Sequence, residues 1–243
     1  MNYRNTLFSY SSEPLLQKSV EYLYSKVWEY ANIAAGEKVL DVGCGSGGFA
    51  SKFGYWNYVG IDLSLSNVEK AKQDSGLPFA VGNALQLPFP DKSFDRIICC
   101  EVLEHFVAAE QVRLLWELGR VLKDEGTIVI SVPNAYYLWC YIPYGLFPIK
   151  RRSTFHKLVE GCRAGNYDEE HEKFSPHYRF TPSYLKNLIE YYTNLLVVKQ
   201  TTTYWYNNRY IKSVPKSIQT LFHKNLRGGL LGSQVVCRCT KKA

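Results

Sequence analysis

The chain has 243 residues, of which 46% are hydrophobic and 21% charged, and this composition excludes collagen-like, fibrous and disordered proteins. A chain of this length predicts one domain with additions rather than two separate domains. The net charge of +7 is unevenly distributed, because residues 1–149 hold 12 Lys+Arg against 16 Asp+Glu, whereas residues 150–243 hold 17 against 6. The basic second half is therefore a candidate surface for an anionic substrate, a lipid headgroup or a nucleic acid.

Cysteine usage and hydropathy indicate the compartment. The seven cysteines include no C-x-x-C pair, and the first residues lack the apolar core of a secretion signal, which favours the reducing cytoplasm. Cys99 and Cys100 lie in an apolar run, and Cys237 and Cys239 share one face of a predicted strand, so we expect buried thiols rather than a metal site. The longest apolar stretch, 136–149, is shorter than the ~20 residues of a membrane span, which predicts no transmembrane segment.

The first half of the chain alternates between helical and strand patterns. Residues 15–31 place apolar side chains at three- and four-residue steps and predict an amphipathic helix, so we expect residues 1–36 to form an N-terminal helical cap. From Lys38 onward, short apolar runs alternate with helical spacing, which indicates a parallel sheet covered on both sides. The predicted strands are 38–43, 57–62, 77–82, 94–101 and 126–132, and the predicted helices include 64–75 and 104–122.

The second half begins with a break in this alternation. Residues 135–178 are rich in aromatic, glycine and charged residues, and a segment of this length within a compact domain is usually functional, so we expect an insertion or lid. Thr181 and Pro182 then predict a helix start, because threonine caps helices and proline fits the first turn. The remaining predicted elements are strands at 195–206 and 233–242, with a helix at about 214–226 between them.

The segment VLDVGCGSGG, residues 39–48, is a predicted strand that runs into a glycine loop. Gly43, Gly45 and Gly47 allow a tight turn and a close approach to a ligand. The spacing also satisfies G-x-G-x-x-G, which dinucleotide-binding folds share. Asp41 disfavours a dinucleotide, because its carboxylate would repel a pyrophosphate. The same carboxylate suits a ligand with a positive charge, such as the ammonium group of an amino acid.

Two further strand ends carry groups that suit a nucleoside. Asp62 ends the next strand about twenty residues on, where a carboxylate can accept both ribose hydroxyls. Leu63 is placed to cover one face of an adenine, and the Asn83 amide, next to Ala84, can recognise a base edge. Turn chemistry is the alternative, because Asp and Gly occupy strand ends in any α/β protein. Four such sites in the correct order favour an adenosine with a cationic, amino-acid-like tail.

These motifs resemble the class I S-adenosylmethionine-dependent methyltransferases, particularly the branch that includes ubiquinone-biosynthesis O-methyltransferases. The resemblance covers residues 38–133 and, more weakly, 177–190; VLDVGCGSG resembles the first motif, GIDLS the ribose motif and GNALQLPFPDKSFD the adenine-side motif. It implies an α/β fold with a doubly wound, mostly parallel seven-stranded sheet, a Rossmann-like methyltransferase fold with an N-terminal helix and a lid insertion. Such folds normally end in an antiparallel strand.

The resemblance also implies S-adenosyl-L-methionine as the cofactor. Asn83 departs from the aspartate that is commonest at its position, but its amide can still bond the exocyclic amine of adenine. The implied cofactor-binding residues, running from the methionine part through ribose and adenine to the region where donor meets acceptor, are Asp41, Gly43, Gly45, Asp62, Leu63, Asn83, Ala84 and Glu101.

The sequence EVLEH places three titratable residues at the carboxyl end of the fourth predicted strand, where open α/β sheets bind ligands. His105 is the candidate general base for a hydroxyl or amine acceptor, with Glu101 as the second candidate catalytic residue. In some quinone-pathway relatives the matching residues hold a divalent metal, so the resemblance leaves a metal open here. Alternatively, Glu104 only opens a helix and His105 packs on it.

The sequence is compatible with several hypotheses for the methyl acceptor. We favour a small molecule, apolar or aromatic, covered by the aromatic residues of 136–147, although those aromatics can equally form a subdomain core or a dimer contact. His177 and Arg179 are candidate substrate residues, Arg179 for an anionic group, and a solvated helix-entry loop is the alternative. The basic half favours a transfer-RNA methyltransferase or weak contact with anionic surfaces. A protein that binds S-adenosylmethionine without catalysis is the third alternative, and Asp41 disfavours a nicotinamide-dependent dehydrogenase.

Overall fold

The computed structural model describes residues 14–54, 57–135, 163–168, 173–203 and 234–242. The strands of the main sheet are β1 (Val39–Val42), β2 (Tyr58–Asp62), β3 (Phe79–Val81), β4 (Phe94–Cys100), β5 (Leu122–Pro133), β8 (Leu195–Thr203) and β9 (Gln234–Lys241). The helices are α1 (Pro14–Ala31), α2 (Gly48–Phe53), α3 (Leu65–Ser75), α4 (Ala108–Val121) and α6 (Pro182–Tyr192), and Leu103–His105 form a short 3-10 helix, η1.

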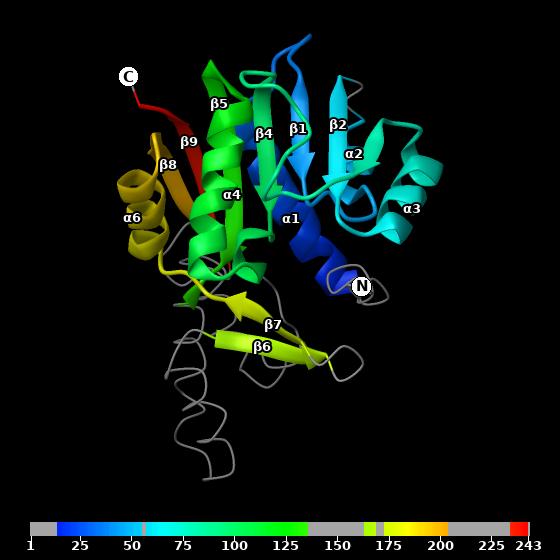
Figure 1. Cartoon of the computed structure of the whole chain (residues 1–243). Helices are drawn as coiled ribbons and strands as arrows, with labels where there is room; N and C mark the ends of the chain where they lie inside the picture. Colours follow the sequence, from blue (N-terminus) through cyan, green and yellow to red (C-terminus); the bar gives the residue numbers. More distant parts are fainter. Residues whose placement is uncertain (1–13, 55–56, 136–162, 169–172, 204–233, 243) are drawn as a thin grey trace, which may run out of the picture.

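The seven strands follow the order β3-β2-β1-β4-β5-β9-β8 in one sheet (Figure 1). Strands β1 to β5 pair in parallel, whereas β9 is antiparallel to both β5 and β8. Strand order reverses between β1 and β4, and open α/β sheets bind ligands at such a reversal, beyond the carboxyl ends of the strands. The structure therefore confirms the predicted doubly wound, mostly parallel seven-stranded sheet.

Successive side chains of the central strands alternate between two cores, one on each face of the sheet. Leu40 and Ile97 join the core under α4 and α6, whereas Val39 and Ile98 join the core under α1, α2 and α3. Figure 1 shows α4 and α6 in front of the sheet and α1 behind it. The same alternation turns the side chain of Asp41 toward α1.

The first helix confirms the prediction for residues 15–31. Leu23, Val27 and Tyr30 recur at helical spacing and are buried in the core on its side of the sheet. The helix contacts β4, β5 and β9, so it covers the middle of the sheet next to the ends of the central strands.

The helix predicted over 104–122 is confirmed only over Ala108–Val121. The chain forms η1, then extends through Phe106 and Val107, and only then enters α4. Two side chains of α4 bond the backbone groups at this break. The Gln111 amide donates to the Phe106 carbonyl at 2.9 Å, and Glu110 accepts the Val107 N–H at 3.2 Å. Consequently Val107, which helical spacing over 104–122 would place on the same face as Leu114 and Leu118, is 44% exposed.

The C-terminal half confirms the helix start and both late strands. Thr181 caps α6 by accepting the Tyr184 N–H at 3.1 Å, with Pro182 in the first turn. Within the expected insertion 135–178, β6 (Arg163–Asp168) and β7 (Lys173–Tyr178) form an antiparallel pair that the sequence pattern did not predict. The expected aromatic lid residues and the helix at about 214–226 lie outside the described residues. None of the helices described has the length and apolar character to cross a membrane.

Candidate functional site

The glycine loop between β1 and α2 has the conformation that the sequence predicts. Gly43, Gly45 and Gly47 have φ angles of 71°, 53° and 79°, in the left-handed region that favours glycine. A Cβ atom on Gly43 would lie 2.3 Å from Cγ2 of Val102, whereas one on Gly45 would have nothing within 4 Å. The loop therefore packs closely beside β4 at Gly43 and borders open space at Gly45.

Asp62 ties this loop to the end of β2. Its carboxylate accepts the N–H groups of Gly45 and Ser64, each at 2.9 Å, and the Asn67 side-chain amide at 3.3 Å. A carboxylate has about four acceptor positions, so these three donors leave one for a ligand hydroxyl. The bond to Asn67 is the longest of the three and the easiest to exchange for a second hydroxyl.

Asp41 is buried at the end of β1 with one strong partner. The Tyr58 hydroxyl donates to its carboxylate at 2.5 Å, and the β1–β2 register places Gly60, which has no side chain, directly opposite it. Burial raises the pKa of Asp41 to about 7, the bond from Tyr58 opposes this rise, and the charge of Asp62 adds to it. A cation bound next to Asp41 would stabilise its ionised form.

Glu101 directly follows β4 and has a left-handed backbone with φ 54°. Its N–H donates to the Ser131 carbonyl at 3.0 Å, and the Ser131 hydroxyl donates to its carboxylate at 2.9 Å. Burial raises the pKa of Glu101 to about 7, while Ser131 and the charge of Arg179 oppose the rise. The two bonds to Ser131 fix the carboxylate at the end of the sheet.

A cavity lies between Asp41 and Glu101, beneath the first helix. Burial raises the pKa of Tyr24, so this phenol in the cavity wall keeps its proton. The residues that line the cavity come from α1, the glycine loop, α2 and β4: Val20, Leu23, Tyr24, Asp41, Gly43, Cys44, Phe49, Ile98, Cys100 and Glu101.

Glu104 and His105 lie in η1 with different exposure. The Glu104 side chain is 1% exposed, its Oε2 has no hydrogen-bond partner among the described residues, and burial and Glu101 raise its pKa well above the usual value. His105 Nε2 lies 3.9 Å from Oε1 of Glu104, and the His105 side chain is 37% exposed. Glu104 lies in the first turn of the short helix η1, whereas the first turn of α4 holds Glu110. Within the described part of the chain, no three His, Cys, Asp or Glu side chains are grouped so that they could hold a metal ion.

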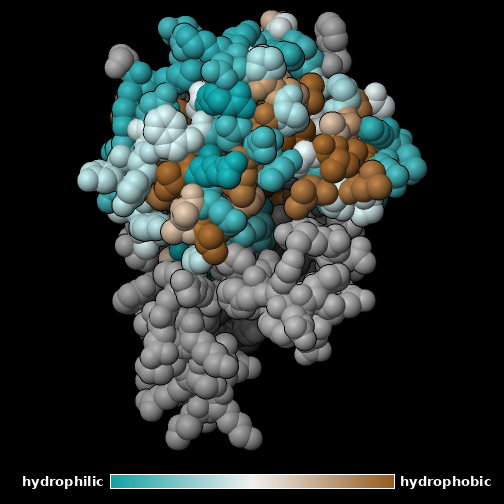
Figure 2. Space-filling model, viewed as in Figure 1, coloured by the Kyte–Doolittle hydropathy of each residue, from teal (hydrophilic) through white to brown (hydrophobic). Residues whose placement is uncertain are grey.

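The predicted adenine-side residues lie beside the end of β2. The N–H of Gly82 donates to the Asp62 carbonyl at 3.0 Å, and the turn that follows holds the Asn83 amide oxygen, which accepts the Leu85 N–H at 2.9 Å. Leu63 is 51% exposed. Figure 2 shows apolar side chains at the surface on the side of the molecule where β3 and α3 lie. An exposed leucine and a free amide edge therefore border the same strand ends.

Of the two predicted substrate residues, the structure describes one side chain. Arg179 follows β7, its charge lowers the pKa of Glu101, and its buried Nε has no hydrogen-bond partner among the described residues. Phe180 anchors this position to β5, because its N–H donates to the Pro133 carbonyl at 2.8 Å. His177 pairs through its backbone with Ala164, and its side chain lies outside the described part.

The structure thus brings the predicted residues of four strand ends together and adds three that the sequence analysis missed. Tyr24, Tyr58 and Ser131 surround the two carboxyl groups. Strand alternation accounts for the burial of Tyr58 and Ser131, but the partners of all three residues depend on strand register and on where the first helix packs. No local pattern carries that information.

Comparison with known proteins agrees with this arrangement. Residues 40–130 match a family model described as a methyltransferase domain. Uncharacterized protein MJ1252 of Methanocaldococcus jannaschii is 37% identical over 139 residues, 53% of this chain and 53% of that protein. Fatty-acid O-methyltransferase of Mycolicibacterium smegmatis is 36% identical over 122 residues, 47% of this chain and 43% of that protein. The chain spans about half the length of the curated relatives that it matches.

Solved structures share the fold across nearly the whole chain. A SAM-dependent methyltransferase of Thermotoga maritima, described as a possible histamine N-methyltransferase, has a TM-score of 0.60 and 20% identity, and the match covers 97% of each chain. The chain therefore shares the Rossmann-like fold of solved SAM-dependent methyltransferases, and the segment that matches the methyltransferase-domain model, residues 40–130, includes the glycine loop and the ends of the first four strands.

Proposed function

We propose that the protein transfers a methyl group from S-adenosylmethionine to a small-molecule acceptor. The observation that carries this proposal is the cavity between Asp41 and Glu101, two carboxyl groups with raised pKa beside an open glycine loop. A site of this kind favours a cationic ligand, because the cation recovers the cost of ionising buried carboxyl groups. A nicotinamide dinucleotide would instead place its pyrophosphate against Asp41.

The described residues fit S-adenosylmethionine at each of its parts. Asp41 with the glycine loop would hold the methionine end, and Asp62 the ribose through its remaining acceptor position. Leu63 and Asn83, with Ala84, would hold the adenine. When bound, the cofactor supplies a methyl group on a positively charged sulfur, which is already activated for displacement. The protein therefore has mainly to orient the two reactants and exclude water.

The residues past β4 would complete the acceptor side. His105 is half-exposed at the crevice and can take a proton at an imidazole nitrogen from a hydroxyl or amine acceptor. Glu101 would face the cationic part of the cofactor. We propose Arg179, and His177 from the same segment, as acceptor contacts, because a guanidinium with an unsatisfied Nε suits an anionic group such as a carboxylate.

Two acceptor chemistries follow from different observations. Arg179 favours a carboxylate, and one relative is a fatty-acid O-methyltransferase. The sequence resemblance to the ubiquinone-biosynthesis branch favours a phenolic hydroxyl, for which His105 would serve as the base. A carboxylate needs no base, because it is already ionised at neutral pH.

Incubation of the protein with methyl-labelled S-adenosylmethionine and a panel of acceptors tests the proposal. The panel contains a long-chain fatty acid, a phenol and transfer RNA, and we expect label in a small molecule. Replacement of His105 by Ala should slow methylation of a phenol by ~10²–10⁴-fold and leave a carboxylate acceptor nearly unaffected. Label in RNA would favour the nucleic-acid alternative, and binding without transfer to any acceptor would indicate a protein that binds S-adenosylmethionine without catalysis. NADH binding as tight as S-adenosylmethionine binding would refute the proposal.

We also propose the reducing cytoplasm as the compartment. All five cysteines in the described part of the chain are free thiols: Cys44, Cys99, Cys100, Cys237 and Cys239. Transfer RNA is a weaker candidate acceptor, because the cations described near the C-terminus already have partners. Arg238 donates to Thr127, and Lys241 pairs with Asp124.

A further inference from the structure

The segment that follows β3 has almost no regular backbone pairing. Apart from a bridge between Asn83 and Gln86, residues 82–93 lie outside every helix and strand of the described structure. Polar backbone groups in such a segment need other partners, because an unpaired buried N–H or carbonyl is costly. The segment is nevertheless anchored, since Leu87 within it is 3% exposed.

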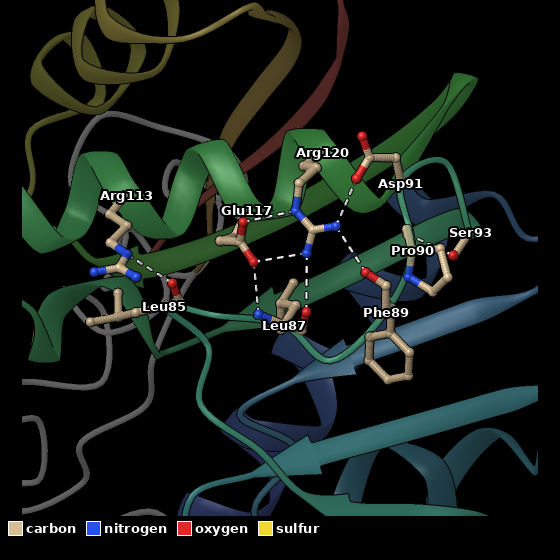
Figure 3. Close-up of polar contacts among 9 residues, drawn as sticks. All are labelled: Leu85, Leu87, Phe89, Pro90, Asp91, Ser93, Arg113, Glu117 and Arg120. Atoms are coloured by element: carbon tan, nitrogen blue, oxygen red, sulfur yellow. Dashed lines mark hydrogen bonds and ion pairs between the residues drawn. The ribbon is translucent and has the colours of Figure 1, made fainter.

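Side chains of α4 supply these partners, as Figure 3 shows. Arg113 Nε donates to the Leu85 carbonyl at 2.9 Å. Glu117 accepts the Leu87 N–H at 2.7 Å, and Arg120 donates to the Leu87 carbonyl at 3.0 Å and to the Phe89 carbonyl at 2.8 Å. Three carbonyls at alternate positions of the segment are thus held from one helix.

The donor and acceptor side chains are themselves fixed. Arg120 bonds both carboxylate oxygens of Glu117, at 2.8 and 2.9 Å, and also Asp91 at 2.8 Å. These carboxylates raise the pKa of the Arg120 guanidinium above its ordinary value. Arg113, Glu117 and Arg120 follow each other at steps of four and three residues, so they share one face of α4. The buried Leu114 and Leu118 hold the other face against the sheet.

The fixed segment is continuous with the turn that faces the cofactor site. The Leu85 N–H donates to the Asn83 amide oxygen, and the Leu85 carbonyl accepts a hydrogen bond from Arg113. A shift of Leu85 would therefore move the Asn83 amide. An amide oxygen has two acceptor positions, so Asn83 keeps one for an exocyclic amine while it holds Leu85.

We propose that Arg113, Glu117 and Arg120 form a clamp that positions the Asn83–Ala84 turn and thereby sets the selectivity of the site for adenine. The three are positioning residues, because they act through Leu85 and Leu87 and not through the ligand. The inference rests on the proposed function, since it assigns the adenine to this turn.

Calorimetric binding of S-adenosylmethionine and of its deaminated analogue, in which a carbonyl oxygen replaces the adenine amine, tests the clamp. Wild-type protein should prefer the amine form. Arg120→Gln should weaken S-adenosylmethionine binding by about tenfold or more, the equivalent of one lost charge-assisted bond. Its affinity for the analogue should change less, so that the preference falls. A variant that is only destabilised would lose affinity for both ligands equally.

Arg120→Lys separates geometry from charge. A lysine keeps the charge but cannot bond Glu117, Leu87 and Phe89 at once, so it should behave like Arg120→Gln. Arg113→Gln removes only the bond to the Leu85 carbonyl, and it replaces Arg120→Gln in the experiment if that variant does not fold. Glu29→Gln is the matched control: it also loses contacts to two cations, Lys26 and Lys199, but on α1 away from the turn, and it should bind both ligands as wild type does.

Amide hydrogen exchange at Leu85 and Leu87 keeps the two proposals distinguishable. Exchange should accelerate in Arg120→Gln and not in Glu29→Gln, whether or not a ligand is present. Wild-type protein that binds neither ligand would overturn the proposed function, and exchange would still decide whether the clamp holds the turn. Unchanged exchange, an unchanged preference for the amine, or full rescue by Arg120→Lys would each overturn the clamp.

Discussion

At the scale of single residues, two carboxyl groups at neighbouring strand ends give the site its character. Asp41 and Glu101 are buried, each accepts a hydroxyl, from Tyr58 and Ser131 respectively, and each has a pKa of about 7. Near neutral pH, binding of a cation should therefore release protons from the site. Glu101 additionally has a left-handed backbone, which costs energy for a residue other than glycine and occurs preferentially at functional sites.

Substitution of Asp41 by Asn should change the pH dependence of cofactor binding. Below its pKa of about 7 Asp41 is neutral, so wild-type affinity for S-adenosylmethionine should rise with pH by up to about tenfold per unit for each carboxyl that must ionise. In the variant, the slope of log affinity against pH should be smaller by up to about one unit, and the part of the slope that comes from Glu101 should remain. Calorimetry between about pH 5.5 and about pH 8.5 measures both slopes.

The stability of the unliganded protein provides the control for Asp41→Asn. A carboxyl with a raised pKa contributes stability that is present below its unfolded pKa and lost as pH rises through its folded pKa. The ordinary value for Asp41 is 3.8 and the folded value about 7, so wild type should lose melting temperature over this window relative to the variant. Identical pH slopes in both proteins would show that Asp41 does not titrate in this range.

At the scale of elements, the first helix belongs to the site as well as to the core. One face of α1 buries Leu23 and Val27, and Val20, Leu23 and Tyr24 also line the cavity. The helix therefore forms the wall opposite the glycine loop. A larger side chain on this face should therefore lower the affinity for the ligand.

Val20→Trp should obstruct the cavity and weaken S-adenosylmethionine binding by about tenfold, the equivalent of ~1–3 kcal/mol of overpacking. Glu21→Trp is the control, because Glu21 lies on the exposed face of the same helix. Calorimetry, to which the added tryptophans contribute no signal, compares the affinity of the two variants and of wild type for S-adenosylmethionine. Equal affinity in the Val20 variant would mean that the ligand does not occupy the space under the helix.

Local patterns predicted most elements correctly but missed the break before α4 and the β6–β7 pair. Apolar spacing continues from Leu103 into α4, so the sequence gives no sign of the break at Phe106 and Val107, which depends on the Gln111 and Glu110 side chains. The β6–β7 pair carries no clean alternation and was missed for that reason. In the site, strand-end residues were predictable because parallel strands bring their carboxyl ends together, whereas Tyr24 depends on the packing of a distant helix.

At the scale of the whole molecule, the sheet depends on its last strand. β9 lies between β5 and β8 and pairs with both. Val235, Val236 and Cys237 are completely buried, and because alternate side chains point to opposite faces, the strand contributes to both cores. Without β9, β8 would have no hydrogen-bonded neighbour in the described sheet.

Val236→Asp should abolish cooperative folding, because an unpaired carboxylate at a fully buried position costs several kcal/mol. Thr240→Asp, at a half-buried position of the same strand, should retain a single thermal transition. Circular dichroism during heating distinguishes these outcomes. A wild-type-like transition in the Val236 variant would show that β9 is dispensable for the core.

The position of β9 also has a consequence for protein synthesis. Strands β1 to β5 leave the ribosome first and can pair in parallel, but the other edge of β5, with Ile128, Val129, Ile130 and Val132, has no neighbour until residues 234–241 emerge. An uncovered aliphatic edge strand is a template for pairing with other chains. More than a hundred residues must be translated before this edge is covered, and at a rate of ~5–20 residues per second this takes about 5–20 seconds. During that interval the nascent chain is most exposed to aggregation and to capture by chaperones.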